Sequence, residues 1–117
     1  MDDFDIPIFK QTYDLYKTFY SYRNLIPKQD RYAIYERCEL VILDVLEGIL
    51  TASKLPKVGS EKISVLERAS IKLNFLRVFV RLMKETKAID AKKYLAIQII
   101  IDEIGRQIGG WIRSTKQ

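Results

Sequence analysis

The sequence predicts an all-α protein, an antiparallel up-down-up-down four-helix bundle that forms a single domain over residues 1–117. Apolar residues recur at spacings of three and four along four segments of about 20 to 27 residues each. The prolines and Gly59 fall near the boundaries of these segments, whereas Gly48, Gly105, Gly109 and Gly110 are exceptions, and no competing strand pattern is present. Four amphipathic helices joined by short connections bury their apolar stripes most simply as a bundle.

The first helix is expected to start near Asp5, which can cap it, and to stop before Pro27. Pro7 fits the first turn, where its missing N–H does no harm. Five aromatic side chains recur at spacings of three and four on one side of this helix: Phe9, Tyr13, Tyr16, Phe19 and Tyr20. The spacing favours an aromatic core face over the alternative of a platform for stacking bases.

The second helix is predicted from Lys28 to Lys54, with a single apolar stripe. The stripe consists of Ile34, Cys38, Val41, Ile42, Val45, Ile49 and Ala52. Cys38 is the only cysteine, and its place on this stripe indicates a small buried residue. A catalytic thiol would need a cationic neighbour or a base, and the chain has no histidine to serve it.

The third helix, from about Glu61 to Lys87, carries two apolar faces, and Ser60 is a possible cap. One face contains Ile71, Phe75, Val78, Phe79 and Leu82, and the other contains Ala69, Leu73, Leu76, Val80 and Met83. A polar row, Ser70, Asn74, Arg77, Arg81 and Lys84, separates them along one edge. Either a central helix is buried on two sides with its arginines reaching solvent, or one face is an oligomer interface beside a basic surface. We expect Leu73, Leu76 and Val80 to form that interface.

The fourth helix, from Asp90 as its cap to Lys116, has a core stripe and a second set of features outside it. The core stripe is Ile97, Ile101, Ile104, Ile108, Trp111 and Ile112. Leu95 and Ile99 lie opposite this stripe among charged residues, as partner contacts or as ordinary exposed apolar side chains. Gly105 and Gly109 are four residues apart, which indicates a close approach of another backbone rather than a frayed helix end.

Composition excludes several classes of function and favours others. The absence of histidine and the single cysteine remove most metal sites and catalytic triads, so we expect no metal, no cofactor and no enzymatic activity. Carboxylates are available for an enzyme, but solvated helix faces account for them better. No apolar run is long enough to span a membrane, and the acidic N-terminus is unlike a secretory signal, so a cytoplasmic location is expected.

The charge of the chain is unevenly distributed. Residues 1–56 carry 7 Lys/Arg against 9 Asp/Glu, whereas residues 57–117 carry 13 against 6. The second half is therefore the basic half, which is typical of nucleic-acid-binding proteins and also of many soluble domains that bind none.

Three stretches of the chain resemble a known family. They are 26–32 (Ile-Pro-Lys-Gln-Asp-Arg-Tyr), 76–82 (Leu-Arg-Val-Phe-Val-Arg-Leu) and 103–112, which ends in Gly-Gly-Trp-Ile. In this order the sequence resembles the accessory variability determinant (Avd) of diversity-generating retroelements. Avd lies within the wider family of four-helix bundles that includes proteins encoded in intervening sequences of ribosomal RNA genes. The resemblance covers nearly the whole chain, although its specific elements are short.

The resemblance implies a non-enzymatic partner of a retroelement reverse transcriptase, a homopentameric ring that binds the enzyme and template RNA or cDNA during mutagenic cDNA synthesis. It places Arg77 and Arg81 on a basic surface. The helical wheel adds Lys84, and Arg68 and Lys72 elsewhere on the same helix are further candidates. The alternative is a bundle that assembles with itself or with another protein and has no nucleic-acid role.

Overall fold

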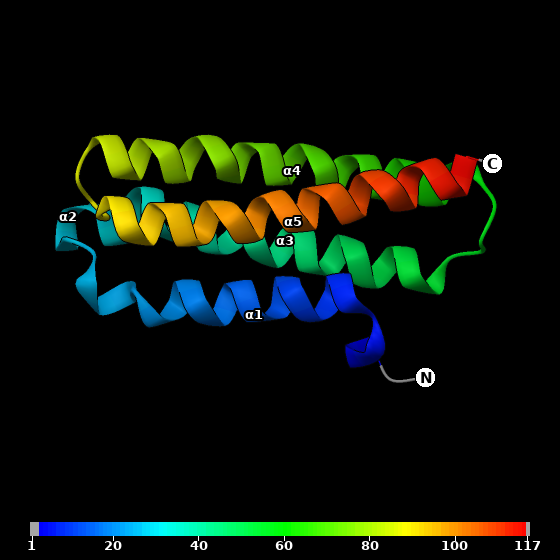
Figure 1. Ribbon diagram of the computed structural model, residues 1–117, viewed down its shortest axis with the longest axis horizontal. Coiled ribbons are helices and arrows are strands. Elements are labelled where there is room, and N and C mark those ends of the chain that lie inside the picture. Colours follow the sequence, from blue (N-terminus) through cyan, green and yellow to red (C-terminus); the bar gives the residue numbers. More distant parts are fainter. Residues whose placement is uncertain (1–2, 117) are drawn as a thin grey trace.

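The computed structural model describes residues 3–116, in which four long antiparallel helices form a bundle (Figure 1). These helices are α1 (Pro7–Ser21), α3 (Glu36–Lys54), α4 (Ser60–Glu85) and α5 (Ala91–Lys116). The short α2 (Lys28–Asp30) precedes α3, and the molecule measures 44 × 25 × 22 Å. The prediction of an all-α four-helix bundle is confirmed.

The four long helices surround one core in the order α1, α3, α4, α5. α3 packs against α1 and α4, and α5 packs against α4 and α1, so α1 and α4 lie diagonally opposite each other. Each of the four long helices contributes fully buried side chains, among them Phe19, Ile42, Leu76 and Ile101. Burying each such side chain stabilises the fold by roughly 1.5–3 kcal/mol, which makes this core the main source of stability.

α1 is shorter than the sequence predicts. Asp5 lies in a separate 3₁₀ turn, and the residue at the cap position is Ile6, so the predicted Asp5 cap is wrong. At the other end the helix stops at Ser21 and a 3₁₀ turn over Arg23–Leu25 follows. Ile26, which precedes Pro27, is extended, as expected for a residue before proline. The aromatic face is only partly a core face, since Phe9 and Phe19 are buried but Tyr13 and Tyr20 are 38% and 56% exposed.

The predicted helix from Lys28 to Lys54 is confirmed, with a π-helical turn over Arg31–Tyr35 between α2 and α3. Its predicted apolar stripe is buried except for Ile34, which is half-buried. The π turn ends at Tyr35, whose ring stacks on Phe19 with centroids 4.6 Å apart and whose hydroxyl donates a 2.5 Å hydrogen bond to the Phe19 carbonyl. This contact fixes the start of α3 against α1.

α4 begins immediately after Gly59, which has a φ of 148° that residues other than glycine rarely adopt. Ser60 is the first helical residue and makes no capping hydrogen bond, so the predicted Ser60 cap is wrong. Near the start of α4 the helix approaches α3 closely. A Cβ atom built on Gly48 would lie 3.3 Å from the Cβ of Ala69. Small residues on both helices therefore set their separation.

The turn between α4 and α5 is closed by hydrogen bonds at both helix ends. Ala88 N–H donates to the Met83 carbonyl and Lys87 N–H donates to the Lys84 carbonyl, the pattern of a Schellman motif with Lys87 at a φ of 66°. At the start of α5, Asp90 Oδ1 accepts a 2.8 Å hydrogen bond from the backbone N–H of Lys93. The predicted Asp90 cap is confirmed. Along the described part of the chain, no helix combines the length and apolar character that crossing a membrane requires.

Candidate nucleic-acid and partner interface

Arg77, Arg81 and Lys84 follow one edge of α4, on the side that faces α5, as the sequence predicts for a polar row. Arg81 is the most exposed of the three and pairs with Glu85 one turn later at 3.2 Å. The Lys84 ammonium group lies 4.6 Å from the centre of the Tyr94 ring on α5, a cation–π contact. The row is thus accessible to a partner, although its charges already have neighbours within the chain.

Arg77 is held more tightly than a purely solvent-facing arginine would be. Its Nε donates to Asp102 Oδ1 on α5 at 3.2 Å, and its Nη1 donates to Asn74 Oδ1 at 2.6 Å. The guanidinium group also lies over Gly105, where an added Cβ atom would be 2.8 Å from Arg77 Nη2. Gly105 therefore makes room for this ion pair between α4 and α5.

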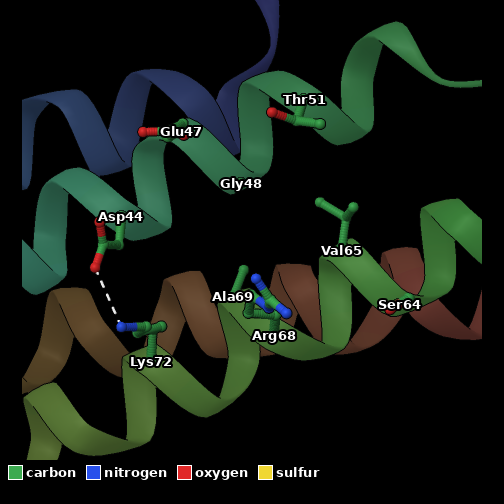
Figure 2. Close-up of a pocket in the computed structure, with 9 residues that line it drawn as sticks. All are labelled: Asp44, Glu47, Gly48, Thr51, Ser64, Val65, Arg68, Ala69 and Lys72. Carbon is green, nitrogen blue, oxygen red and sulfur yellow. Dashed lines mark ion pairs between the residues drawn. The ribbon is translucent and has the colours of Figure 1, made fainter.

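Arg68 and Lys72 lie on the opposite edge of α4, facing α3 rather than α5 (Figure 2). They line a groove of about 470 Å³ together with Asp44, Glu47 and Thr51 of α3. Lys72 pairs with Asp44 at 3.2 Å across the groove. The five predicted basic residues therefore form two separate groups on the two edges of α4.

The predicted oligomer interface on α4 is wrong in its choice of face. Leu73, Leu76 and Val80 are at most 1% exposed and fill the core of their own subunit. Both faces of the helix are apolar in sequence, but only the face containing the small residue Ala69 allows the close packing of α3 against Gly48. Packing at this point decides which face turns inward.

The exposed apolar face of α4 is the one opposite to the face that the sequence predicts to form the interface. Four of its side chains are 44–62% exposed: Ile71, Phe75, Val78 and Leu82. Their spacings of four, three and four residues match a heptad seam, so we call these four residues the α4 stripe. The α4 stripe runs between the two basic groups. The sequence shows that this face is apolar, but it predicts the interface on the opposite face of the helix.

The remaining predicted interface residues lie on α5. Leu95 and Ile99 are 59% and 61% exposed, so both are available to a partner. Gly105 contacts the side chains of Arg77 and Leu73 in its own chain, and only the Arg113 guanidinium group, at 3.5 Å, comes near a Cβ atom built on Gly109. Within the subunit no other backbone approaches these two glycines, because side chains lie beside them instead. The predicted backbone approach is therefore wrong for contacts inside the chain.

The surroundings of two kinds of group bear on chemical reactivity: the single thiol and any cluster of possible metal ligands. Cys38 is fully buried, and burial followed by the nearby Glu39 raises its pKa to about 12, so the sulfur is an unreactive thiol at neutral pH. Within residues 3–116, no group of three or more His, Cys, Asp or Glu residues is arranged to hold a metal ion.

Comparison with known families places the chain in one of them. The family model described as bAvd-like matches residues 7–115, from the start of α1 to the last turn of α5. The bAvd-like family is not known as an enzyme family. No curated protein matches the chain.

Proposed function

Because the chain belongs to the bAvd-like family, we propose that it is the non-enzymatic accessory protein of a diversity-generating retroelement. In this role it acts in the cytoplasm and binds the element's reverse transcriptase and template RNA or cDNA to support mutagenic cDNA synthesis. The observation that carries the proposal is the family match over the whole bundle. The excess of basic residues in the second half of the chain supports contact with nucleic acid.

We propose further that the protein is a homo-oligomer, with the pentameric ring of the family as the expected form, and that the α4 stripe is its interface. A heptad seam of four exposed apolar residues is suited to packing against another helix. The same chain offers a complementary surface on α3, where Leu40 and Leu43 are 52% and 40% exposed beside Glu36 and Glu47. Contact between two different faces of neighbouring copies is the kind that closes into a ring.

Arg77 and Arg81 are proposed to contact the reverse transcriptase or the RNA beside this interface. Phosphates and carboxylates both bind guanidinium groups well, so the row suits either partner. Since each arginine already pairs with a carboxylate of its own chain, a partner must compete with Asp102 and Glu85. Because the contact with the partner is itself electrostatic, binding should weaken as salt concentration rises.

The test is co-purification of the full-length protein with the reverse transcriptase and template RNA of a diversity-generating retroelement that encodes it. The double variant Arg77→Gln/Arg81→Gln should lose a large part of this binding and keep its helical circular dichroism. The matched control, Arg68→Gln/Lys72→Gln, removes the same charge from the other edge of α4. Absence of any complex with the wild-type protein would refute the proposed function, and equal binding by both double variants would refute the role of the arginine row.

A second function, self-assembly without nucleic acid, is favoured by one observation. The α4 stripe explains an oligomer by itself and needs no RNA. An oligomer in light scattering that shows no salt-dependent shift of RNA would support this alternative over the retroelement role.

A further inference from the structure

The end of the bundle where two connections meet is the most strongly charged part of the molecule. One connection, residues 22–32, leads from α1 through α2 into the π turn, and the other, residues 84–94, leads from α4 into α5 (Figure 1). We call these two segments the connector end. They are in contact, because the Lys93 ammonium group lies 5.9 Å from the centre of the Tyr22 ring. Residues of both segments, including Leu25 and Lys87, line a shared cleft of about 180 Å³.

Most of the net charge of the chain is located there. The connector end carries seven Lys/Arg against three Asp/Glu, a net +4 out of the total of +5. The helical stretches between the two ends of the bundle, residues 10–21, 33–51, 63–83 and 95–110, carry eight against eight and are neutral. These neutral stretches contain Arg77 and Arg81. Along the sequence the excess of positive charge belongs to the second half of the chain. In the folded protein it is concentrated at one end of the bundle.

Ion pairs within the chain leave this balance unchanged. Arg23 pairs with Glu39, which lies outside the connector end, and Glu85 pairs with Arg81, which also lies outside it. With those two residues set aside, six cations face two carboxylates, again a net +4. The six are Lys28, Arg31, Lys84, Lys87, Lys92 and Lys93, and the carboxylates are Asp30 and Asp90. Lys93 also pairs with Asp90 at 2.9 Å inside the connector end, which leaves the net charge unchanged. A strand of phosphates would therefore meet a surface with net positive charge here.

Local structure fixes part of this surface and leaves the rest exposed. Lys28, Lys87 and Lys92 are exposed, and the Schellman motif holds the backbone of Lys87 in its left-handed conformation. Lys84 and Lys93 lie against the rings of Tyr94 and Tyr22, which restricts their side chains.

Apolar surface accompanies the charge. Tyr32 and Leu25, each 63% exposed, add an aromatic ring and an aliphatic side chain to the connector end. A surface that combines lysines with exposed aromatic rings is the type that binds single-stranded nucleic acid, because the lysines neutralise phosphates and the rings stack on unpaired bases.

We propose that the connector end is the site that binds the phosphate backbone of single-stranded RNA, with Tyr32 stacking on a base. This inference rests on the proposed function and assigns its RNA contact to residues 22–32 and 84–94. Binding there is expected to be mainly electrostatic and to show little base selectivity. In a closed cyclic assembly, equivalent sites lie at one height along the symmetry axis, so a ring would present every connector end to the same RNA and increase its avidity.

The test uses the full-length protein and a short fluorescein-labelled single-stranded RNA, with anisotropy measured between about 50 and 200 mM salt. The triple variant Lys28→Gln/Lys87→Asn/Lys92→Gln removes three exposed charges, and asparagine suits the left-handed conformation at position 87. It should bind at least about tenfold more weakly at low salt, and its slope of log affinity against log salt should be shallower by about 2. The matched control, Lys57→Gln/Arg113→Gln/Lys116→Gln, removes the same charge from exposed positions at the opposite end and should bind as the wild type does.

Two further measurements make the outcome specific to RNA. Tyr32→Ala should weaken binding of single-stranded RNA more than binding of a duplex, because only unpaired bases can stack on the ring. Polyglutamate should compete poorly with RNA. If polyglutamate competes as well as RNA and Tyr32→Ala has no effect, the site binds an acidic protein segment and the proposal is wrong.

Failure of this proposal can be distinguished from failure of the proposed function. If the wild-type protein binds RNA and both triple variants weaken it equally, the connector end is not the site, although the retroelement role stands. If the wild-type protein binds no RNA at low salt, both the RNA binding in the proposed function and its assignment to the connector end are wrong.

Discussion

Glu39 is the residue at which the fold places a charge in an unfavourable position. It is 6% exposed near the start of α3, and its Oε2 has no hydrogen-bond partner among the described residues. Its Oε1 accepts a hydrogen bond from Arg23 Nη1 at a long 3.4 Å. Burial raises the pKa of the Glu39 carboxyl, while Arg23 lowers it and Glu36 raises it further. The pair thus joins the α1–α3 connection to α3 at a cost in desolvation.

This carboxyl predicts how stability responds to pH. Because its pKa is raised in the folded state, the native protein binds the proton more tightly than the unfolded chain does. The stability gained from the protonated Glu39 carboxyl is fully present below pH 4.5, the ordinary pKa of a glutamate. It is lost as pH rises through the raised pKa of the folded state. Relative to Glu39→Gln, the wild-type protein should therefore gain thermal stability as pH falls from neutrality toward 4.5. Parallel melting-temperature curves for the two proteins over this range would contradict the assignment.

Glycines play different roles in two of the helix pairs. At the α3–α4 contact, Gly48 faces the Cβ of Ala69, an atom that cannot rotate away. At the α4–α5 contact, Gly105 faces the end of the flexible Arg77 side chain, and the next nearest atom, Leu73 Cδ2, is at an ordinary 3.5 Å. The two positions are similar as helical glycines in the sequence, but only the first sets the distance between two backbones.

The contrast predicts opposite effects of the same substitution. Replacing a helical glycine with alanine gains up to about 1 kcal/mol in helix propensity. Gly105→Ala should therefore leave the free energy of unfolding unchanged or raise it by up to about 1 kcal/mol, because Arg77 can move aside. Gly48→Ala should lower it by about 1 kcal/mol, since overpacking against Ala69 outweighs the gain. Urea unfolding of the two variants measures this difference, and a more damaging effect at Gly105 would show that the Arg77–Asp102 pair is the tighter constraint.

The whole molecule separates its two kinds of surface. The α4 stripe and the exposed apolar residues of α3 lie along the sides of the bundle, whereas net positive charge is concentrated at the connector end. Assembly through the sides would leave the charged end accessible. A ring built in this way could bind RNA at one rim without disturbing the contacts that hold the ring together.

Assembly through the α4 stripe has a direct test in solution. The wild-type protein should be larger than its 13.7 kDa chain in multi-angle light scattering, and Phe75→Glu/Val78→Glu should reduce it to the monomer mass. Both side chains are exposed, at 49% and 62%, so the variant should remain folded by circular dichroism. Leu95→Glu/Ile99→Glu introduces the same charges on α5 as a comparison. A monomeric wild type would contradict the proposed interface, and dissociation only of the α5 variant would move the interface to that helix.

The sequence by itself determined the number, type and approximate limits of the long helices, the buried stripe of α3 and the Asp90 cap, because these depend on local periodicity and on contacts within a few residues. It also showed that α4 has two apolar faces. Only the tertiary structure decided that Leu73, Leu76 and Val80 turn inward and that the α4 stripe stays outside, because the close fit of Ala69 against Gly48 is a contact between distant parts of the chain. The same holds for the connector end, since residues 22–32 and 84–94 form one basic surface only after the bundle brings them together.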